Sequence, residues 1–146
     1  MKICRTKDYQ VMIITEKKGD IFTTEDKHIV FALNTNGYND GGFAGQVAKR
    51  GFTEILNTGG NQLGEVLEKT IDGITYHGIV CHSLEPGGWA ESPEIILKAL
   101  NEMTFDDNAS IVAIGAGFIG ALSGAPWDRI KESFNKCNKR LTIWTY

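Results

Sequence analysis

The chain has 146 residues, of which 42% are hydrophobic and 23% are charged, and its formal net charge is −3. These values are ordinary for a soluble globular protein, so we expect residues 1–146 to form a single domain. The negative charge excludes the basic surface with which proteins bind duplex nucleic acid. No apolar stretch approaches the length of a membrane span, and the first residues do not resemble a signal peptide. We therefore expect a cytoplasmic protein without a membrane partner.

The three cysteines are widely spaced and match no metal-binding motif. Cys4, Cys81 and Cys137 are predicted to be reduced thiols, and no metal or cofactor is expected. A nucleophilic Cys81, at the end of a strand beside His82, is the alternative interpretation.

Apolar runs in the first part of the chain predict two strands. Residues 9–15 are rich in β-branched side chains and favour a strand that ends in the charged turn 16–20. Residues 29–33 are apolar throughout, which is typical of a buried strand. This strand leads directly into the glycine-rich stretch 34–45.

The middle of the chain combines a helix with a hairpin. Residues 42–50 predict a short helix that stops at Gly51, and residues 52–57 predict a further helical turn. Asp72-Gly73 separates two β-rich runs, which is a strong signal for a β-hairpin.

The last third of the chain alternates helices with strands. Residues 92–103 begin with Ser-Pro and carry apolar residues at helical spacing, so they predict a helix. Residues 111–114 predict a second buried strand, which leads into the glycines of 115–120. A helix over 127–137 and a strand over 141–146 complete the chain. This alternation predicts an α/β fold with a mixed, mostly parallel sheet that is covered on both faces.

Both glycine-rich stretches follow a predicted buried strand. Glycine lets a ligand approach backbone N–H groups closely, and the N-terminus of a helix favours negative charge. In sheets of this kind ligands bind beyond the carboxyl ends of the strands. Two such loops in one short chain predict a pair of walls around a diphosphate.

Four motifs, in their order and spacing, resemble the macrodomain family over residues 18–146. They are Gly19-Asp20-Ile21, Asn34-Thr-Asn36, Gly41-Gly-Phe-Ala-Gly45 and Gly115-Ala-Gly-Phe118. Macrodomains bind ADP-ribose and related NAD-derived nucleotides. The resemblance therefore implies a three-layer α/β/α macrodomain whose partner is ADP-ribose, an ADP-ribose derivative or an ADP-ribosylated macromolecule. It implies nothing about the oligomeric state.

The resemblance also implies a role for each residue that matches a family motif. Asp20 and the N–H of Ile21 would hold the adenine, and Trp144 would pack on it. Asn34 and Asn36 would line the distal ribose. The alternatives are that Asp20 and the two asparagines serve only their turns, and that Trp144 belongs to the core. Backbone amides from both loops would enclose the diphosphate, namely those of Gly42, Phe43, Ala44, Gly45, Gly115, Ala116, Gly117, Phe118 and Ile119.

Within the family, the chain looks most like the compact branch that contains terminal ADP-ribose protein glycohydrolases, antitoxin macrodomains and ADP-ribose-1″-phosphate phosphatases. The implied activity is hydrolysis at the 1″ position of the distal ribose. Glycohydrolase members use an Asp and a Lys where this chain has Ile119 and His82, so their covalent mechanism is in doubt. Gly124-Ala-Pro-Trp-Asp128 resembles a motif of the phosphatases and favours that activity over a mono-ADP-ribosyl hydrolase. A short insertion over 121–123 separates this motif from the second glycine loop.

Three residues are candidates for the hydrolytic step. His82 and Asp40 could activate water, and Asn36 could orient it. The ordinary pKa of histidine, about 6.5, suits acid–base chemistry near neutrality. Structural roles are the alternatives, since a strand-end histidine is commonly structural and Asp40 could cap the following helix. The alternative function is a binder without turnover, a reader or sponge of ADP-ribose or of a cyclic NAD-derived signal.

Overall fold

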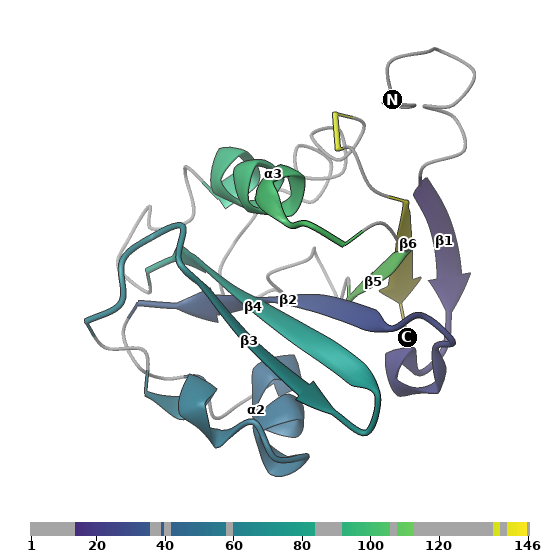
Figure 1. Ribbon diagram of the computed structural model, residues 1–146, viewed down its shortest axis with the longest axis horizontal. Coiled ribbons are helices and arrows are strands. Elements are labelled where there is room, and N and C mark those ends of the chain that lie inside the picture. Colours follow the sequence, from purple (N-terminus) through teal and green to yellow (C-terminus); the bar gives the residue numbers. More distant parts are fainter. Residues whose placement is uncertain are drawn as a thin grey trace.

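A six-stranded sheet forms the middle layer of the protein in the computed structural model, which describes residues 14–35, 39, 42–57, 60–83, 92–105, 108–112, 136–137 and 140–145. Helix α3 lies on one face of the sheet, and helix α2 lies on the other (Figure 1). The elements in chain order are β1 (Ile14–Lys18), the 3-10 helix η2 (Ile21–Thr23), β2 (His28–Asn34), α2 (Gly42–Lys49), the 3-10 helix η3 (Thr53–Leu56), β3 (Val66–Ile71), β4 (Ile74–His82), α3 (Ser92–Glu102), β5 (Ala109–Val112) and β6 (Leu141–Thr145).

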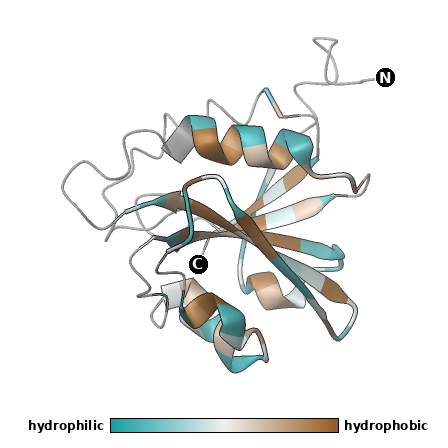
Figure 2. Ribbon diagram, turned by 60° about the vertical axis from the view of Figure 1, so that its left-hand side comes forward, coloured by the Kyte–Doolittle hydropathy of each residue, from teal (hydrophilic) through white to brown (hydrophobic). Residues whose placement is uncertain are grey.

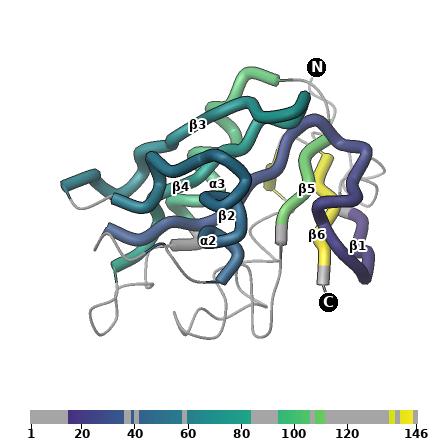
Figure 3. Tube along the Cα trace, turned by 90° about the horizontal axis from the view of Figure 1, so that it is seen from below, coloured from purple at the N-terminus to yellow at the C-terminus, as the bar shows by residue number. Residues whose placement is uncertain are grey.

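The strand order is β1-β6-β5-β2-β4-β3, and all neighbours are parallel except β3 and β4. Strands β1, β6 and β5 run side by side (Figures 1 and 3). The predicted mixed, mostly parallel α/β sheet is thus confirmed. Because β1, β2, β4, β5 and β6 run in one direction, their carboxyl ends lie at one edge of the sheet. This carboxyl edge is where ligands of such sheets bind.

The predicted hairpin joins the antiparallel pair β3 and β4. Asp72 and Gly73 form its turn with φ angles of 50° and 83°. Two consecutive positive φ angles define the turn type that matches the twist of a two-stranded ribbon, and Asp-Gly accommodates them best. The helices predicted over 42–50 and 92–103 and the buried strand over 29–33 are also confirmed to within two residues.

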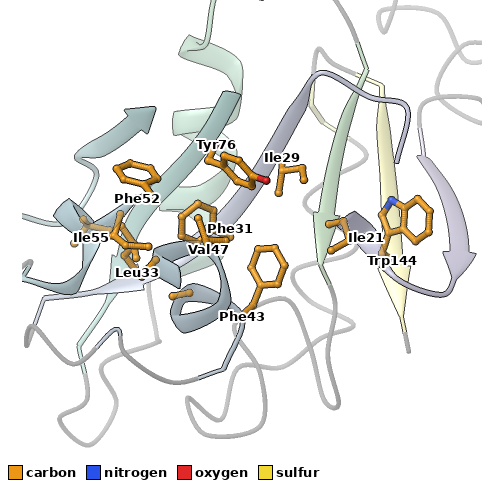
Figure 4. Close-up of a cluster of buried hydrophobic side chains, with 13 residues drawn as sticks. Ile21, Ile29, Phe31, Leu33, Phe43, Val47, Phe52, Ile55, Tyr76 and Trp144 are labelled. Atoms are coloured by element: carbon orange, nitrogen blue, oxygen red, sulfur yellow. The ribbon is translucent and has the colours of Figure 1, made fainter. Parts of the chain in front are cut away.

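The core lies on both faces of the sheet because β2 sends alternate side chains to opposite sides. Val30 packs under α3 with Ile96 and Leu100. Phe31 and Leu33 pack toward α2 (Figure 4). Figure 2 shows the same pattern, with hydrophobic residues concentrated in the strands between the two helices and hydrophilic residues at the turns.

Two strand boundaries differ from the sequence-based expectation. The charged residues Glu16, Lys17 and Lys18 do not form a turn but continue β1, because each pairs in parallel with a residue of β6. Strand β5 begins at Ala109, two residues earlier than expected, because Ala109 and the buried Ser110 pair with residues of both β2 and β6. Cross-strand pairing outweighed the local preference in both places.

Candidate functional site

Asp20 lies in the turn that follows β1, at the carboxyl edge of the sheet. Its Oδ1 accepts a hydrogen bond of 3.0 Å from the N–H of Phe22 and thereby caps η2. Among the described residues, no hydrogen bond involves the Oδ2 atom of this exposed carboxylate. One oxygen can therefore hold the turn while the other accepts a hydrogen bond from a ligand.

Trp144 of β6 packs against this turn, in the same hydrophobic cluster as Ile21 (Figure 4). A Cβ atom on Gly19 would lie 3.7 Å from Cζ3 of the indole, and the Nζ atom of Lys17 lies 5.4 Å from the ring centroid. The Trp144 side chain is only 7% exposed. The indole is thus covered by the protein itself, which matches the core alternative and places Trp144 as a support for the Asp20 turn. Packing of its face on a base stays a prediction.

The hydroxyl of Ser110 holds the Trp144 indole through a hydrogen bond to its ring N–H. It donates a hydrogen bond of 2.8 Å to Oδ2 of Asp26 and accepts one of 3.0 Å from Nε1 of Trp144. The Oγ1 atom of Thr24 lies 2.8 Å from the same hydroxyl and accepts a hydrogen bond from the N–H of Asp26. Since Ser110 has one proton and gives it to the carboxylate, Thr24 is the donor in their contact. The network ties β5, β6 and the segment after η2 together.

Ser110→Ala is expected to lower the free energy of unfolding by about 1–3 kcal/mol, because it leaves three buried or half-buried polar groups without their shared partner. Urea unfolding followed by circular dichroism measures the change. Thr70→Val is the matched control, since it breaks a 2.8 Å hydroxyl contact with Thr75 on the exposed hairpin. Equal losses in both variants would contradict the importance assigned to the buried hydroxyl.

The first glycine-rich stretch ends in helix α2, as predicted. Gly42 begins the helix with a φ of 56°, a left-handed conformation that a side chain rarely adopts. Phe43, Ala44 and Gly45 of the first turn are buried against the sheet. The first backbone N–H groups of a helix have no partner within the helix, and its N-terminus carries partial positive charge. The start of α2 therefore offers donors suited to an anion.

An aromatic stack joins the Asp20 turn to the start of α2. The rings of Phe22 and Phe43 are stacked, with centroids 5.2 Å apart and an interplanar angle of 17°. The guanidinium of Arg50 lies 3.6 Å from the centroid of the Phe22 ring. The turn that contains Asp20 and the N-terminal turn of α2 are thus in contact through Phe22 and Phe43, although more than twenty residues of chain separate them.

A buried asparagine that the sequence analysis did not single out lies between β2 and α2. The Oδ1 atom of Asn39 accepts a hydrogen bond of 3.1 Å from the N–H of Asn34, and its Nδ2 donates one of 3.0 Å to the carbonyl of Ile55. Both asparagines are buried. In the sequence Asn39 is an asparagine in a glycine-rich stretch, a pattern that predicts an exposed turn residue rather than a buried amide.

His82 ends β4 and pairs with Asn34 of β2 after a register shift. It is 6% exposed, and burial lowers its pKa from 6.5 to about 4. The imidazole is therefore neutral at neutral pH, which disagrees with the titration near neutrality on which its candidacy as a catalyst depended. Its Nδ1 lies 3.7 Å from Sγ of Cys81, whose pKa is raised by burial. Cys81 is consequently a protonated thiol and a poor nucleophile.

Several predicted site residues lie outside the described part of the chain. They are Asn36, Asp40, Gly115, Ala116, Gly117, Phe118 and Ile119, together with the insertion and the motif over 121–128.

Within the described ranges, no three His, Cys, Asp or Glu side chains gather as a metal site would require. The helices of the described residues are all too short or too polar to span a membrane.

Comparison with solved structures identifies the fold. The macrodomain of Mycobacterium tuberculosis DarG matches with a TM-score of 0.65 and 14% identity, over 90% of this chain and 96% of that one. The macrodomain of Thermus aquaticus DarG matches with a TM-score of 0.65 and 15% identity, over 91% of this chain and 97% of that one. A Trypanosoma brucei macrodomain in complex with ADP-ribose matches with a TM-score of 0.59 and 13% identity, over 95% of this chain and 66% of that one. No protein-family model and no curated sequence matches the chain. The chain has the macrodomain fold, and the resemblance seen in its sequence motifs is confirmed at that level.

Proposed function

We propose that this protein binds ADP-ribose or a close derivative at the carboxyl edge of its sheet. The observation that carries the proposal is the Phe22–Phe43 stack, with ring centroids 5.2 Å apart. It joins the turn that carries a carboxylate acceptor, Asp20, to the N-terminal turn of α2. An adenine amino group is a hydrogen-bond donor and a diphosphate is an anion, so a nucleotide diphosphate presents the two complementary groups. The likeness to a Trypanosoma brucei macrodomain in complex with ADP-ribose, and to one in complex with ADP, supports the same ligand class.

Asp20→Ala is expected to weaken ADP-ribose binding by about 1.5–3 kcal/mol, which is the usual contribution of a hydrogen bond to a charged group. Titration calorimetry measures the change. Asp20→Asn keeps an oxygen that can cap η2 while removing the charge, so it separates loss of the ligand contact from loss of the cap. Glu25→Ala removes an exposed carboxylate five residues away and serves as the matched control. Unchanged affinity in Asp20→Ala would remove Asp20 from the adenine site.

Hydrolysis at the 1″ position of the distal ribose is the finer form of this proposal. The resemblance of residues 124–128 to the phosphatase motif supports ADP-ribose-1″-phosphate as the substrate. Neutral His82 could accept a proton from water, although a pKa of about 4 makes it a weak base. Asp40 and Asn36 are the other candidates for activating and orienting that water.

A binder without turnover is the second candidate, and the low pKa of His82 favours it. Incubation with ADP-ribose-1″-phosphate and, separately, with ADP-ribosylated protein distinguishes the two. Free phosphate or free ADP-ribose supports the hydrolase. Tight binding of ADP-ribose without either product supports the reader or sponge.

A further inference from the structure

Asn39 is an unusual residue for a glycine-rich loop because its amide is buried. Its side chain is 4% exposed, although it lies in the connection between β2 and α2. A buried amide that lacks hydrogen-bond partners is costly, so such a side chain is kept where its bonds are made. Both ends of the Asn39 amide make one: Oδ1 to the N–H of Asn34 and Nδ2 to the carbonyl of Ile55.

The hydrogen bond to Asn34 occurs where the sheet becomes irregular. The register between β2 and β4 shifts between Leu33 and Asn34, and the N–H of Thr35 donates to the carbonyl of His82 at 3.0 Å. Such an irregularity redirects the side chain that follows it. The N–H of Asn34 is then satisfied by the Asn39 side chain. Asn39 thus stabilises the conformation in which β2 ends.

The hydrogen bond to Ile55 connects the same point to η3. The Ile55 side chain is fully buried and packs in one cluster with Val47 of α2. Through one amide, the end of β2 is therefore linked to the segment that packs against α2. The two hydrogen bonds of Asn39 thus hold the end of β2 and η3 together.

We propose that Asn39 is a positioning residue for the distal half of the ligand. This inference rests on the proposed function, in which Asn34 lines the distal ribose and the start of α2 meets the diphosphate. Asn39 fixes the backbone of Asn34 and its distance from η3 and α2. Asp20, which is proposed to hold the adenine, lies in a different segment, whose turn packs on Trp144 and meets α2 through the Phe22–Phe43 stack and not through Asn39. Loss of Asn39 therefore weakens binding of the distal part of the nucleotide selectively.

The test compares ADP-ribose with AMP, which keeps the adenosine but lacks the distal phosphate and ribose. In Asn39→Ala we expect the affinity for ADP-ribose to fall about tenfold or more, while the affinity for AMP stays within about twofold. Asn101→Ala is the matched control, because the Nδ2 of Asn101 on α3 also donates to a backbone carbonyl, that of Lys136, at 3.4 Å. We expect the control to leave both affinities unchanged.

Equal loss for both ligands, or loss for neither, would overturn the inference and leave the proposed function standing. Failure of the unmodified protein to bind ADP-ribose at all would overturn the proposed function, and the inference with it. If Asn39→Ala does not fold, Asn39→Ser is measured in the same way, because serine is neutral and polar but too short to make both hydrogen bonds of the Asn39 amide. Amide exchange in the unmodified protein gives a reading without substitution. Slow exchange at Asn34 supports the link, and exchange as fast as in an exposed turn contradicts it.

Discussion

Phe31→Ala is expected to lower the free energy of unfolding by about 3–5 kcal/mol, the range for removing a buried aromatic ring and leaving a cavity. Phe31 is 1% exposed and lies on the α2 face of β2. Its ring meets Phe43 edge-on at a centroid distance of 5.8 Å and Phe52 at 6.5 Å. Substitution removes both aromatic contacts in addition to the buried area.

Urea unfolding followed by circular dichroism measures this loss. An unchanged slope of the free energy of unfolding against urea concentration would show that the native state stays compact. Phe31→Leu is the conservative control and is expected to lose less, because it fills most of the space. A loss below about 1 kcal/mol in Phe31→Ala would show that the site collapses around the deletion and that the ring is not central to this core. Because Phe43 lies in the first turn of α2, we also expect weaker nucleotide binding in the alanine variant.

Stability is expected to fall as the pH is lowered from 6.5 toward 4, because His82 is buried in its neutral form. Its pKa is about 4 in the folded protein, against an ordinary value of 6.5 in the unfolded chain, so between these values the unfolded chain binds more protons. The contribution is fully present above pH 6.5 and is lost as pH falls through the folded pKa. The loss amounts to about 3 kcal/mol in total, and about 2 kcal/mol of it has occurred by pH 5.

The measurement is the free energy of unfolding at pH 7.5 and pH 5 for the unmodified protein and for His82→Gln. Glutamine keeps a polar side chain but does not titrate, so the variant should lose about 2 kcal/mol less between the two pH values. The other two histidines, His28 and His77, are present in both proteins and cancel in the comparison. The same pH dependence in both proteins would show that His82 is not buried as the structure has it.

The elements that the sequence predicted well are those whose local signals agree with their surroundings. Local sequence alone favours a single structure at three places: the Asp72-Gly73 turn, the Ser-Pro start of α3 and the apolar run of β2. Sequence motifs also predicted the macrodomain fold, because their order and spacing are specific even where the identity to solved macrodomains is 13–15%.

Other features depend on contacts between distant parts of the chain, which local patterns do not contain. Ser110 and Asn39 are polar residues that would ordinarily be exposed, and only their partners from other segments explain their burial. The pKa of His82 is likewise set by burial, which a strand-end histidine does not reveal in sequence. The position of Asp20 beside a short turn could be predicted, whereas its proximity to α2 through Phe22 and Phe43 could not.

The outer strand β1 has a consequence for the behaviour of the protein at high concentration. From Thr15 to Lys18 its side chains are exposed, and three of the four are charged. If the β1 strand of a second molecule paired here in register, its Lys17 and Lys18 would lie beside Lys17 and Lys18 of the first molecule, and the like charges would repel each other. The charged side chains that β1 leaves exposed thus disfavour edge-to-edge stacking of molecules into fibrils.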